Sequence, residues 1–270
     1  MLIKLYAVLA AVIEVAIVFL TDVLSGWADV WIPIVMYVGL FVSFLVLHLI
    51  VLIVVSLSVN TKKPCEKPSR FCKFLVDYTV EAVLMLAQVK IEASGLEKIP
   101  TDRRFLLVSN HRSNLDPFIC IAKLKSYDVA FISKPENFKI PIAGPFIRKC
   151  CFLPIDRENA RNAMKTLHKA TDFVKNDVCS MGIYPEGTRS RSAELLEFKD
   201  GVFYIAKKAP CPIVVITVEN TEKIVKNFPF RGTTVKMDVL DVITPDSFAD
   251  ETTHAISDNV RQMMLKRLGK

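Results

Sequence analysis

Residues that build disulfide frameworks or metal sites are sparse in this sequence, and those present are poorly spaced for either. The seven cysteines are odd in number, include one adjacent pair and form no C-x-x-C spacing. The four histidines include no H-E-x-x-H arrangement. Zinc sites and disulfide frameworks depend on such spacings. The sequence therefore predicts no metal site, and it favours a reducing environment for the thiols.

Motifs of two large enzyme classes are also missing. The G-x-S-x-G segment of many serine hydrolases is absent. Gly182 and Gly187 are spaced as in a P-loop, but Thr188 and Arg189 occupy the positions where lysine and then serine or threonine should follow. These absences disfavour a serine hydrolase and nucleoside triphosphate chemistry.

The positive charge of the chain indicates an acidic partner without identifying it. The formal net charge is +7 and the pI is about 9.0. No helix–turn–helix, zinc-finger or RNP-like pattern accompanies this charge, which disfavours nucleic acid as the partner. Basic residues instead follow directly after an apolar stretch, where anionic lipid headgroups would meet them: Lys62, Lys63, Lys67, Arg70 and Lys73. We therefore expect membrane lipids as partners.

Two long apolar runs occupy residues 3–20 and 32–59 and are separated by a short polar connection. The second run exceeds the roughly 20 residues that cross a bilayer. The first contains Glu14, which would cost about 2.5–3.5 kcal/mol at the bilayer centre unless it meets a partner such as His48. Whether this run spans the bilayer or lies in its interface is open. Lys4 and the basic cluster predict a two-helix hairpin in the cell membrane, with the remaining chain on the cytoplasmic face.

An amphipathic helix is expected at residues 69–88, between the hairpin and the rest of the chain. Its apolar residues recur at three- and four-residue steps: Phe71, Phe74, Leu75, Tyr78, Ala82, Met85 and Leu86. Such a stripe either contacts the membrane or packs on a protein core, and the pattern serves both. We divide the chain into a membrane hairpin at 1–60, a basic linker with this helix at 61–89, and a domain at 90–270.

Short apolar runs alternate with helix-like stretches in the remainder of the chain. The runs are typical of buried strands and lie at residues 105–109, 129–133, 151–155, 181–184, 213–218 and 235–242. Helical patterns occur at 159–175 and 251–268. This alternation predicts an α/β fold in which a largely parallel sheet is flanked by helices on both faces. Functional groups then belong at the carboxyl ends of the strands.

A polar loop with a histidine follows the first of these strands. Histidine has an ordinary pKa of about 6.5, so at neutral pH His111 can accept a proton from an alcohol and contribute about 10²–10⁴-fold to a rate. Asp116, brought back by a turn, would bind Nδ1–H and leave Nε2 free as the base. A second interpretation makes Asp116 the cap of a helix that begins at Pro117. The two interpretations are compatible and both stay open.

A second polar segment, Tyr-Pro-Glu-Gly-Thr-Arg-Ser at residues 184–190, follows a later strand. Gly187 would let backbone N–H groups approach an anion, Thr188 adds a hydroxyl, and Arg189 offers a bidentate fork for phosphate. Charge-assisted hydrogen bonds of this kind contribute about 1.5–3 kcal/mol each. A turn with no further function also explains the segment.

Four segments together carry a resemblance to a known family. They are His111 with Asp116 five positions later, then residues 152–157, 184–189 and 212–215. In order and spacing they resemble the four blocks of the glycerolipid acyltransferase family, and most closely its PlsC-type 1-acyl-sn-glycerol-3-phosphate acyltransferases. The resemblance covers about residues 90–245. Tyr184 stands where the family often has phenylalanine.

The resemblance implies a reaction as well as a fold. In such enzymes, His111 would deprotonate the sn-2 hydroxyl of lysophosphatidate while Asp116 orients the imidazole. The alkoxide would attack the thioester of acyl-CoA or acyl carrier protein, giving phosphatidate for phospholipid biosynthesis. No cofactor is implied beyond the acyl donor.

The resemblance also implies a set of residues that bind the acceptor and its phosphate: Lys134, Arg157, Glu186, Gly187, Thr188 and Arg189. Lys134 is equally well explained as an ordinary solvated lysine. Another lysophospholipid or a lyso-aminolipid is an alternative acceptor. A noncatalytic membrane protein that binds lipid or phosphate is an alternative of a different class, and it would need Arg157 and Arg189 but no His–Asp pair.

Overall fold

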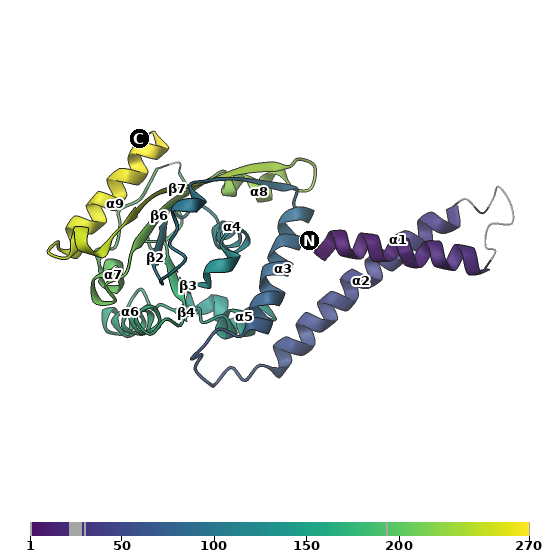
Figure 1. The fold of residues 1–270 in the computed structure, drawn as a ribbon, viewed down its shortest axis with the longest axis horizontal. Coiled ribbons are helices and arrows are strands. Elements are labelled where there is room, and N and C mark those ends of the chain that lie inside the picture. The colour runs from purple at the N-terminus through teal and green to yellow at the C-terminus, as the bar shows by residue number, and fades with distance from the viewer. Residues whose placement is uncertain (1, 22–28, 30, 193, 270) are drawn as a thin grey trace. The chain divides into compact units, whose positions relative to one another are not determined.

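The computed structural model describes residues 2–21, 29, 31–192 and 194–269, and the chain divides into two compact units, residues 1–60 and 61–270 (Figure 1). The linker and helix expected at 61–89 lie in the second unit. Most of the polar connection expected between the two apolar runs lies outside the described residues.

The first unit contains α1 (Leu2–Thr21) and α2 (Trp31–Ser58), which pack against each other. Both are long and apolar enough to cross a bilayer, which indicates association with a membrane. Tyr6 stacks on Phe44, with ring centroids 5.5 Å apart, and its hydroxyl lies 3.3 Å from Nδ1 of His48. Glu14 lies eight positions further along α1, or about 12 Å. Tyr6, rather than Glu14, therefore lies opposite His48.

The second unit begins with α3 (Arg70–Leu86), which Ser69 caps by accepting a hydrogen bond from the N–H of Cys72. The helix packs on the domain through a buried face of Cys72, Leu75, Val80 and Leu84. Its opposite side keeps large apolar side chains exposed: Phe71, Phe74, Met85 and Leu86. Both interpretations of the amphipathic pattern thus remain relevant. The pattern left the buried face undetermined, and the structure shows that this helix carries apolar residues on both sides.

Seven strands form one sheet in the order β1-β7-β6-β2-β5-β3-β4. They are β1 (Val89–Ser94), β2 (Leu106–Ser109), β3 (Val129–Ser133), β4 (Leu153–Pro154), β5 (Ser180–Ile183), β6 (Ile213–Glu219) and β7 (Thr233–Ile243). Five of the six strand pairs are parallel, and only β6–β7 is antiparallel. The predicted α/β fold with a largely parallel sheet is therefore confirmed.

Helices cover both faces of this sheet, as Figure 1 shows. On one side lie α3, α4 (Asp116–Lys123) and α8 (Thr221–Asn227), and on the other α6 (Ala160–Lys175), α7 (Tyr204–Lys208) and α9 (Thr253–Leu268). Helix α5 (Ala143–Lys149) packs near α3. Short 3₁₀ turns join these elements: η2 (Leu96–Lys98), η3 (Lys125–Tyr127), η4 (Pro135–Lys139), η5 (Asp200–Phe203) and η6 (Pro245–Phe248).

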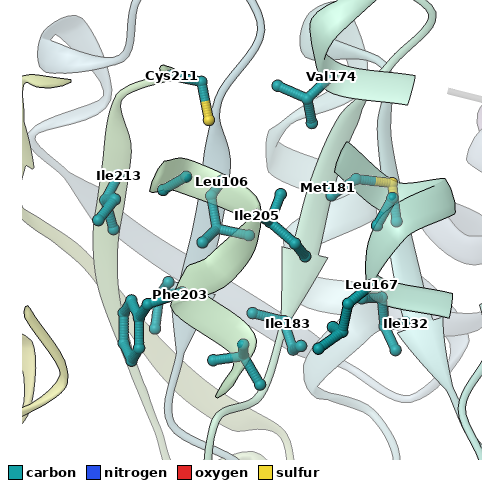
Figure 2. Packing of buried hydrophobic residues seen from close by; sticks show 14 of the residues in the cluster. Leu106, Ile132, Leu167, Val174, Met181, Ile183, Phe203, Ile205, Cys211 and Ile213 are labelled. Carbon is teal, nitrogen blue, oxygen red and sulfur yellow. The ribbon is translucent and has the colours of Figure 1, made fainter. Parts of the chain in front are cut away.

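Alternate strand residues fill two separate cores. Leu106 packs in the core beneath α6, α7 and α9, whereas its neighbour Leu107 packs in the core beneath α3, α4 and α8. Figure 2 shows the first of these cores, where Leu106 and Met181 from neighbouring strands lie close to Ile205 of α7. Because both faces are covered, the central strands are continuous apolar runs, which is why the sequence shows them clearly.

Element boundaries differ from the predictions at a few places. The strand expected at 151–155 is only Leu153–Pro154, because Cys150 ends α5 and Cys151 adopts a positive φ of 61°. The edge strand β1 was not predicted, since it alternates apolar and polar residues instead of forming an apolar run.

Replacing Gly182 by alanine is expected to destabilise the second unit. A Cβ at Gly182 would lie 2.5 Å from Cε1 of Phe131, so this ring, which stacks on Tyr184, would have to move. Overpacking of this kind costs about 1–3 kcal/mol. Urea unfolding of the detergent-solubilised protein measures the loss.

Gly201→Ala is the matched control, because a Cβ at Gly201 meets nothing within 4 Å. Its free energy of unfolding should change by less than about 0.5 kcal/mol. Equal stability of the two variants would contradict the packing described around Phe131.

Candidate active site

The candidate site lies where three neighbouring strands end. β2 pairs in parallel with both β5 and β6, so the carboxyl ends of all three meet at one edge of the sheet. The histidine loop follows β2, residues 184–190 follow β5, and Thr221 follows β6 closely. The two polar segments singled out in the sequence therefore lie at the same end of the strands.

A buried carboxylate organises this edge. Oδ2 of Asp116 lies 2.7 Å from Nδ1 of His111. The same oxygen accepts hydrogen bonds from the N–H groups of Arg112, at 2.7 Å, and Ser113, at 2.8 Å. The other oxygen, Oδ1, accepts a hydrogen bond from the hydroxyl of Thr221. Asp116 is fully buried, so these four donors replace the water that the carboxylate has lost.

The structure supports the contact of Asp116 with His111 but not its role as a helix cap. Helix α4 begins at Asp116 with Pro117 in its first turn, one residue earlier than predicted. The carboxylate does not cap this helix, because it accepts from N–H groups that precede the helix and from His111. Asp116 is thus both the first residue of α4 and the partner of the imidazole.

The environment of His111 leaves one ring nitrogen for chemistry. An ionised carboxylate can only accept hydrogen bonds, so Nδ1 of His111 donates to Asp116 and Nε2 keeps its lone pair. The imidazole stacks on the ring of Tyr184 at a centroid distance of 4.2 Å and an interplanar angle of 20°. Tyr184 stacks in turn on Phe131, at 5.8 Å and 13°. The direction of Nε2 is therefore fixed by two contacts, one polar and one aromatic.

A second buried carboxylate, that of Glu186, accepts a hydrogen bond from the backbone of the histidine loop. Oε1 accepts a hydrogen bond from the N–H of His111 at 2.6 Å, and Oε2 accepts one from the N–H of Leu196 at 3.0 Å. Burial raises the pKa of Glu186 above its usual value, and the two N–H donors oppose this rise. The N–H of Ser190 also donates to the carbonyl of His111, at 2.8 Å. Both oxygens of Glu186 are engaged with the backbone, so its binding of an acceptor stays a prediction.

The remaining predicted residues lie around the same edge but further out. Gly187 has a φ of 68°, which allows the turn closed by its N–H to the carbonyl of Tyr184 at 3.0 Å. Exposed polar side chains follow β3, β4 and β5 at their carboxyl ends: Lys134, Arg157, Thr188 and Arg189. Within the described ranges, none of these four makes a hydrogen bond or ion pair to the His111–Asp116 pair. The three cationic side chains and the threonine hydroxyl are exposed to solvent, where an anion can reach them.

Two residues of the site were not identified from the sequence. Thr221 required knowledge that β6 is a direct neighbour of β2, and the order of strands is not written in local patterns. Tyr184 was noted as the start of the second polar segment and as a family departure but was given no role, although its ring stacks on the imidazole of His111. The available signal for Thr221 was its place in a short polar segment that follows a strongly apolar strand, two residues after Glu219.

Similarity to known proteins agrees with this geometry. Residues 90–219 match the Acyltransferase family. A chloroplastic 1-acyl-sn-glycerol-3-phosphate acyltransferase of Brassica napus is 38% identical over 136 residues, covering 50% of this chain and 39% of the relative. The 1-acyl-sn-glycerol-3-phosphate acyltransferase of Saccharomyces cerevisiae is 28% identical over 196 residues, covering 71% of this chain and 63% of the relative. This chain thus spans less than two thirds of the length of either relative.

The fold also occurs in a solved structure. The crystal structure of PlsC, the 1-acyl-sn-glycerophosphate acyltransferase of Thermotoga maritima, matches with a TM-score of 0.60 and 20% identity, covering 99% of this chain and 96% of that chain. Identity at this level establishes the shared fold. The match of residues 90–219 to the Acyltransferase family and the similarity to these relatives confirm the resemblance carried by the four sequence blocks.

Thr221→Val is expected to destabilise the protein, because valine keeps the shape of the side chain but removes the donor to Asp116. A buried acceptor left without its partner costs about 1–3 kcal/mol. Urea unfolding in detergent measures this cost. Thr234→Val, at an exposed position of β7, should change stability by less than about 0.5 kcal/mol. Equal changes in the two variants would show that the Thr221 hydroxyl is not needed.

Proposed function

We propose that this chain is an enzyme that transfers a fatty acyl group to the sn-2 hydroxyl of lysophosphatidate, producing phosphatidate. The observation that carries this proposal is the 2.7 Å contact between Nδ1 of His111 and the buried carboxylate of Asp116, which leaves Nε2 as a base at the strand ends. The names of the Brassica and yeast relatives support this choice of acceptor.

The reaction needs a base but no protein nucleophile. Nε2 of His111 takes the proton of the acceptor hydroxyl as its oxygen attacks the thioester carbonyl carbon of acyl-CoA or acyl carrier protein. The carbon–sulfur bond of the resulting tetrahedral intermediate breaks, and the leaving thiolate takes this proton from the imidazolium. Asp116 stabilises the imidazolium and keeps the proton of Nδ1 in place.

The cations around the edge of the site would bind the acceptor phosphate. Arg189 follows a glycine turn and offers a bidentate fork, while Arg157 and Lys134 follow the next two strands along the sheet. Thr188 adds a hydroxyl, and the N–H groups around Gly187 add uncharged donors. A phosphate held there would place the glycerol hydroxyl towards the centre of the sheet edge, where His111 lies.

The apolar helices α1 and α2 fit an enzyme whose acceptor and product are lipids. We infer that they anchor the chain in the cell membrane with the catalytic unit on the cytoplasmic face, where acyl-CoA and acyl carrier protein are present. Fixing the enzyme at the bilayer raises the local concentration of an acceptor that partitions into it.

His111→Ala is expected to lower the turnover of lysophosphatidate by about 10²–10⁴-fold, because it removes the base. The thermal midpoint should also fall, because the substitution removes one of the four donors to Asp116 and the stack on Tyr184, so turnover is measured at a temperature at which the variant is folded. Product formation from purified protein in nanodiscs, followed by mass spectrometry, measures the change. Full activity of the variant would leave a noncatalytic lipid-binding protein as the better account.

His254→Ala is the matched control, because His254 also contacts a carboxylate through Nδ1, Oδ2 of Asp200 at 2.9 Å, but is exposed on α9. Its turnover should equal that of the unaltered protein. A similar loss in both variants would show that the effect of His111→Ala is not catalytic.

Arg189→Ala is expected to raise KM for lysophosphatidate by about 10–100-fold while changing kcat little, because a charge-assisted phosphate contact contributes about 1.5–3 kcal/mol. Steady-state kinetics with lysophosphatidate and with its uncharged monoacylglycerol analogue measure the phosphate contribution. Arg161→Ala, which removes an exposed cation from α6, should leave both constants unchanged. An unchanged KM for Arg189→Ala would remove this arginine from the phosphate site.

A further inference from the structure

Helix α8 and the segment after it carry three exposed apolar side chains, and among the described residues of the second unit Phe230 is the most exposed large apolar one. Phe230 is 92% exposed, Phe228 is 52% exposed, and Val225 on α8 is 73% exposed. We call these three residues the aromatic tip. Large apolar side chains gathered at one exposed place mark a site of interaction, because water solvates them poorly.

The backbone beneath the aromatic tip is well ordered by hydrogen bonds. The N–H of Arg231 donates to the carbonyl of Asn227 at 2.8 Å, and the side chain of Asn227 donates to Oγ1 of Thr233 at 2.9 Å. Nε2 of Gln88 donates to the carbonyl of Pro229 at 3.1 Å. With these polar groups satisfied inside the protein, the loop can leave bulk water at little cost.

The loop lies beside the end of α3, as the contact of Gln88 with Pro229 shows and as can be followed in Figure 1. Leu86, two residues before Gln88, is itself exposed. The last turn of α3, which ends close to this loop, therefore also carries an exposed apolar side chain.

Exposed cations lie next to the residues of the aromatic tip in the sequence: Lys223, Lys226 and Arg231, which we call the cationic rim. In the part of the chain that the structure describes, no carboxylate forms an ion pair with any of the three. The nearby Glu222 faces Arg112 instead, at 3.7 Å. Apolar and aromatic side chains bordered by unpaired cations are typical of surfaces that enter the headgroup region of an anionic bilayer.

We propose that the aromatic tip and the cationic rim form a second membrane-docking surface, separate from α1 and α2, which inserts into an anionic lipid surface. The tip enters the boundary between headgroups and acyl chains, and the rim binds lipid phosphates. Each cation near an anionic lipid surface contributes about fivefold to binding. The negative charge of the lipid complements the positive charge of the rim, and this favours lipid over an uncharged protein partner.

This surface is connected to the candidate active site through one short helix. Helix α8 begins at Thr221, whose hydroxyl donates to Asp116, and its seven residues end at Asn227, directly before Phe228 of the aromatic tip. Seven helical residues span about 10 Å. On the proposed function, a docked loop therefore holds the His111–Asp116 pair about one helix length from the bilayer surface, where lysophosphatidate is found.

The direct test places a fluorescent probe at the aromatic tip. Phe230→Trp is introduced into the full chain, with Trp27 and Trp31 replaced by phenylalanine, and reconstituted in vesicles of phosphatidylglycerol and phosphatidylcholine. We expect brominated acyl chains to reduce its emission by about half, because the ring lies at their depth. Ile140→Trp, at an exposed apolar position before α5, is the matched control and should keep its emission.

Emission at position 230 that is quenched no more than at position 140 would overturn the proposal. An emission shift that depends on protein concentration in lipid-free micelles, without quenching in vesicles, would also overturn it, because a second copy of the chain would then cover the tip. Both readouts need no substrate, so their failure is distinguishable from failure of the proposed acyl transfer.

Charge reversal tests the cationic rim. Lys226→Glu with Arg231→Glu in the Phe230→Trp background should weaken binding to anionic vesicles by at least about 25-fold, since two cations of about fivefold each are lost. Lys175→Glu with Arg161→Glu makes the same change of net charge on α6 and should have no effect. Equal quenching in all three proteins would contradict the role of the rim.

Discussion

The buried carboxylate of Asp116 is the group on which the rest of the site depends. A carboxylate without water is stable in a protein only when donors surround it. Here the donors are His111, two backbone N–H groups of the same loop, and the hydroxyl of Thr221. The last of these comes from the element after β6, so the carboxylate is satisfied only because β6 lies beside β2 in the sheet. The order of strands in the sheet therefore determines whether the carboxylate of Asp116 has all of its donors.

The buried and the exposed charged groups of the site make different contacts. Asp116 and Glu186 are both buried and both hold the histidine loop, one through the imidazole and the other through the backbone N–H of His111. Arg157 and Arg189 are exposed after neighbouring strands. Buried anions therefore fix the position of His111, while exposed cations are left where an anion can reach them. Helix α8 links the carboxylate of Asp116 to the aromatic tip, the surface that we propose enters the bilayer.

Local patterns predicted the strands that end at the site, because central strands buried on both faces are apolar runs followed by polar loops. They also predicted that His111 and Asp116 would meet, since a turn of five residues joins them. They did not predict Thr221 or the aromatic platform of Tyr184, because both depend on which strands are neighbours. Nor did periodicity identify the buried face of α3, since a helix that is apolar on two sides has no single preferred orientation.

The central claim is that Asp116 holds the proton of His111 on Nδ1 and leaves Nε2 as the base. Nitrogen-15 chemical shifts of histidine-labelled protein, assigned by the loss of one signal in His111→Ala, test it most directly. The account predicts that neutral His111 is protonated on Nδ1 and unprotonated on Nε2. A neutral His111 that carries its proton on Nε2 would contradict it.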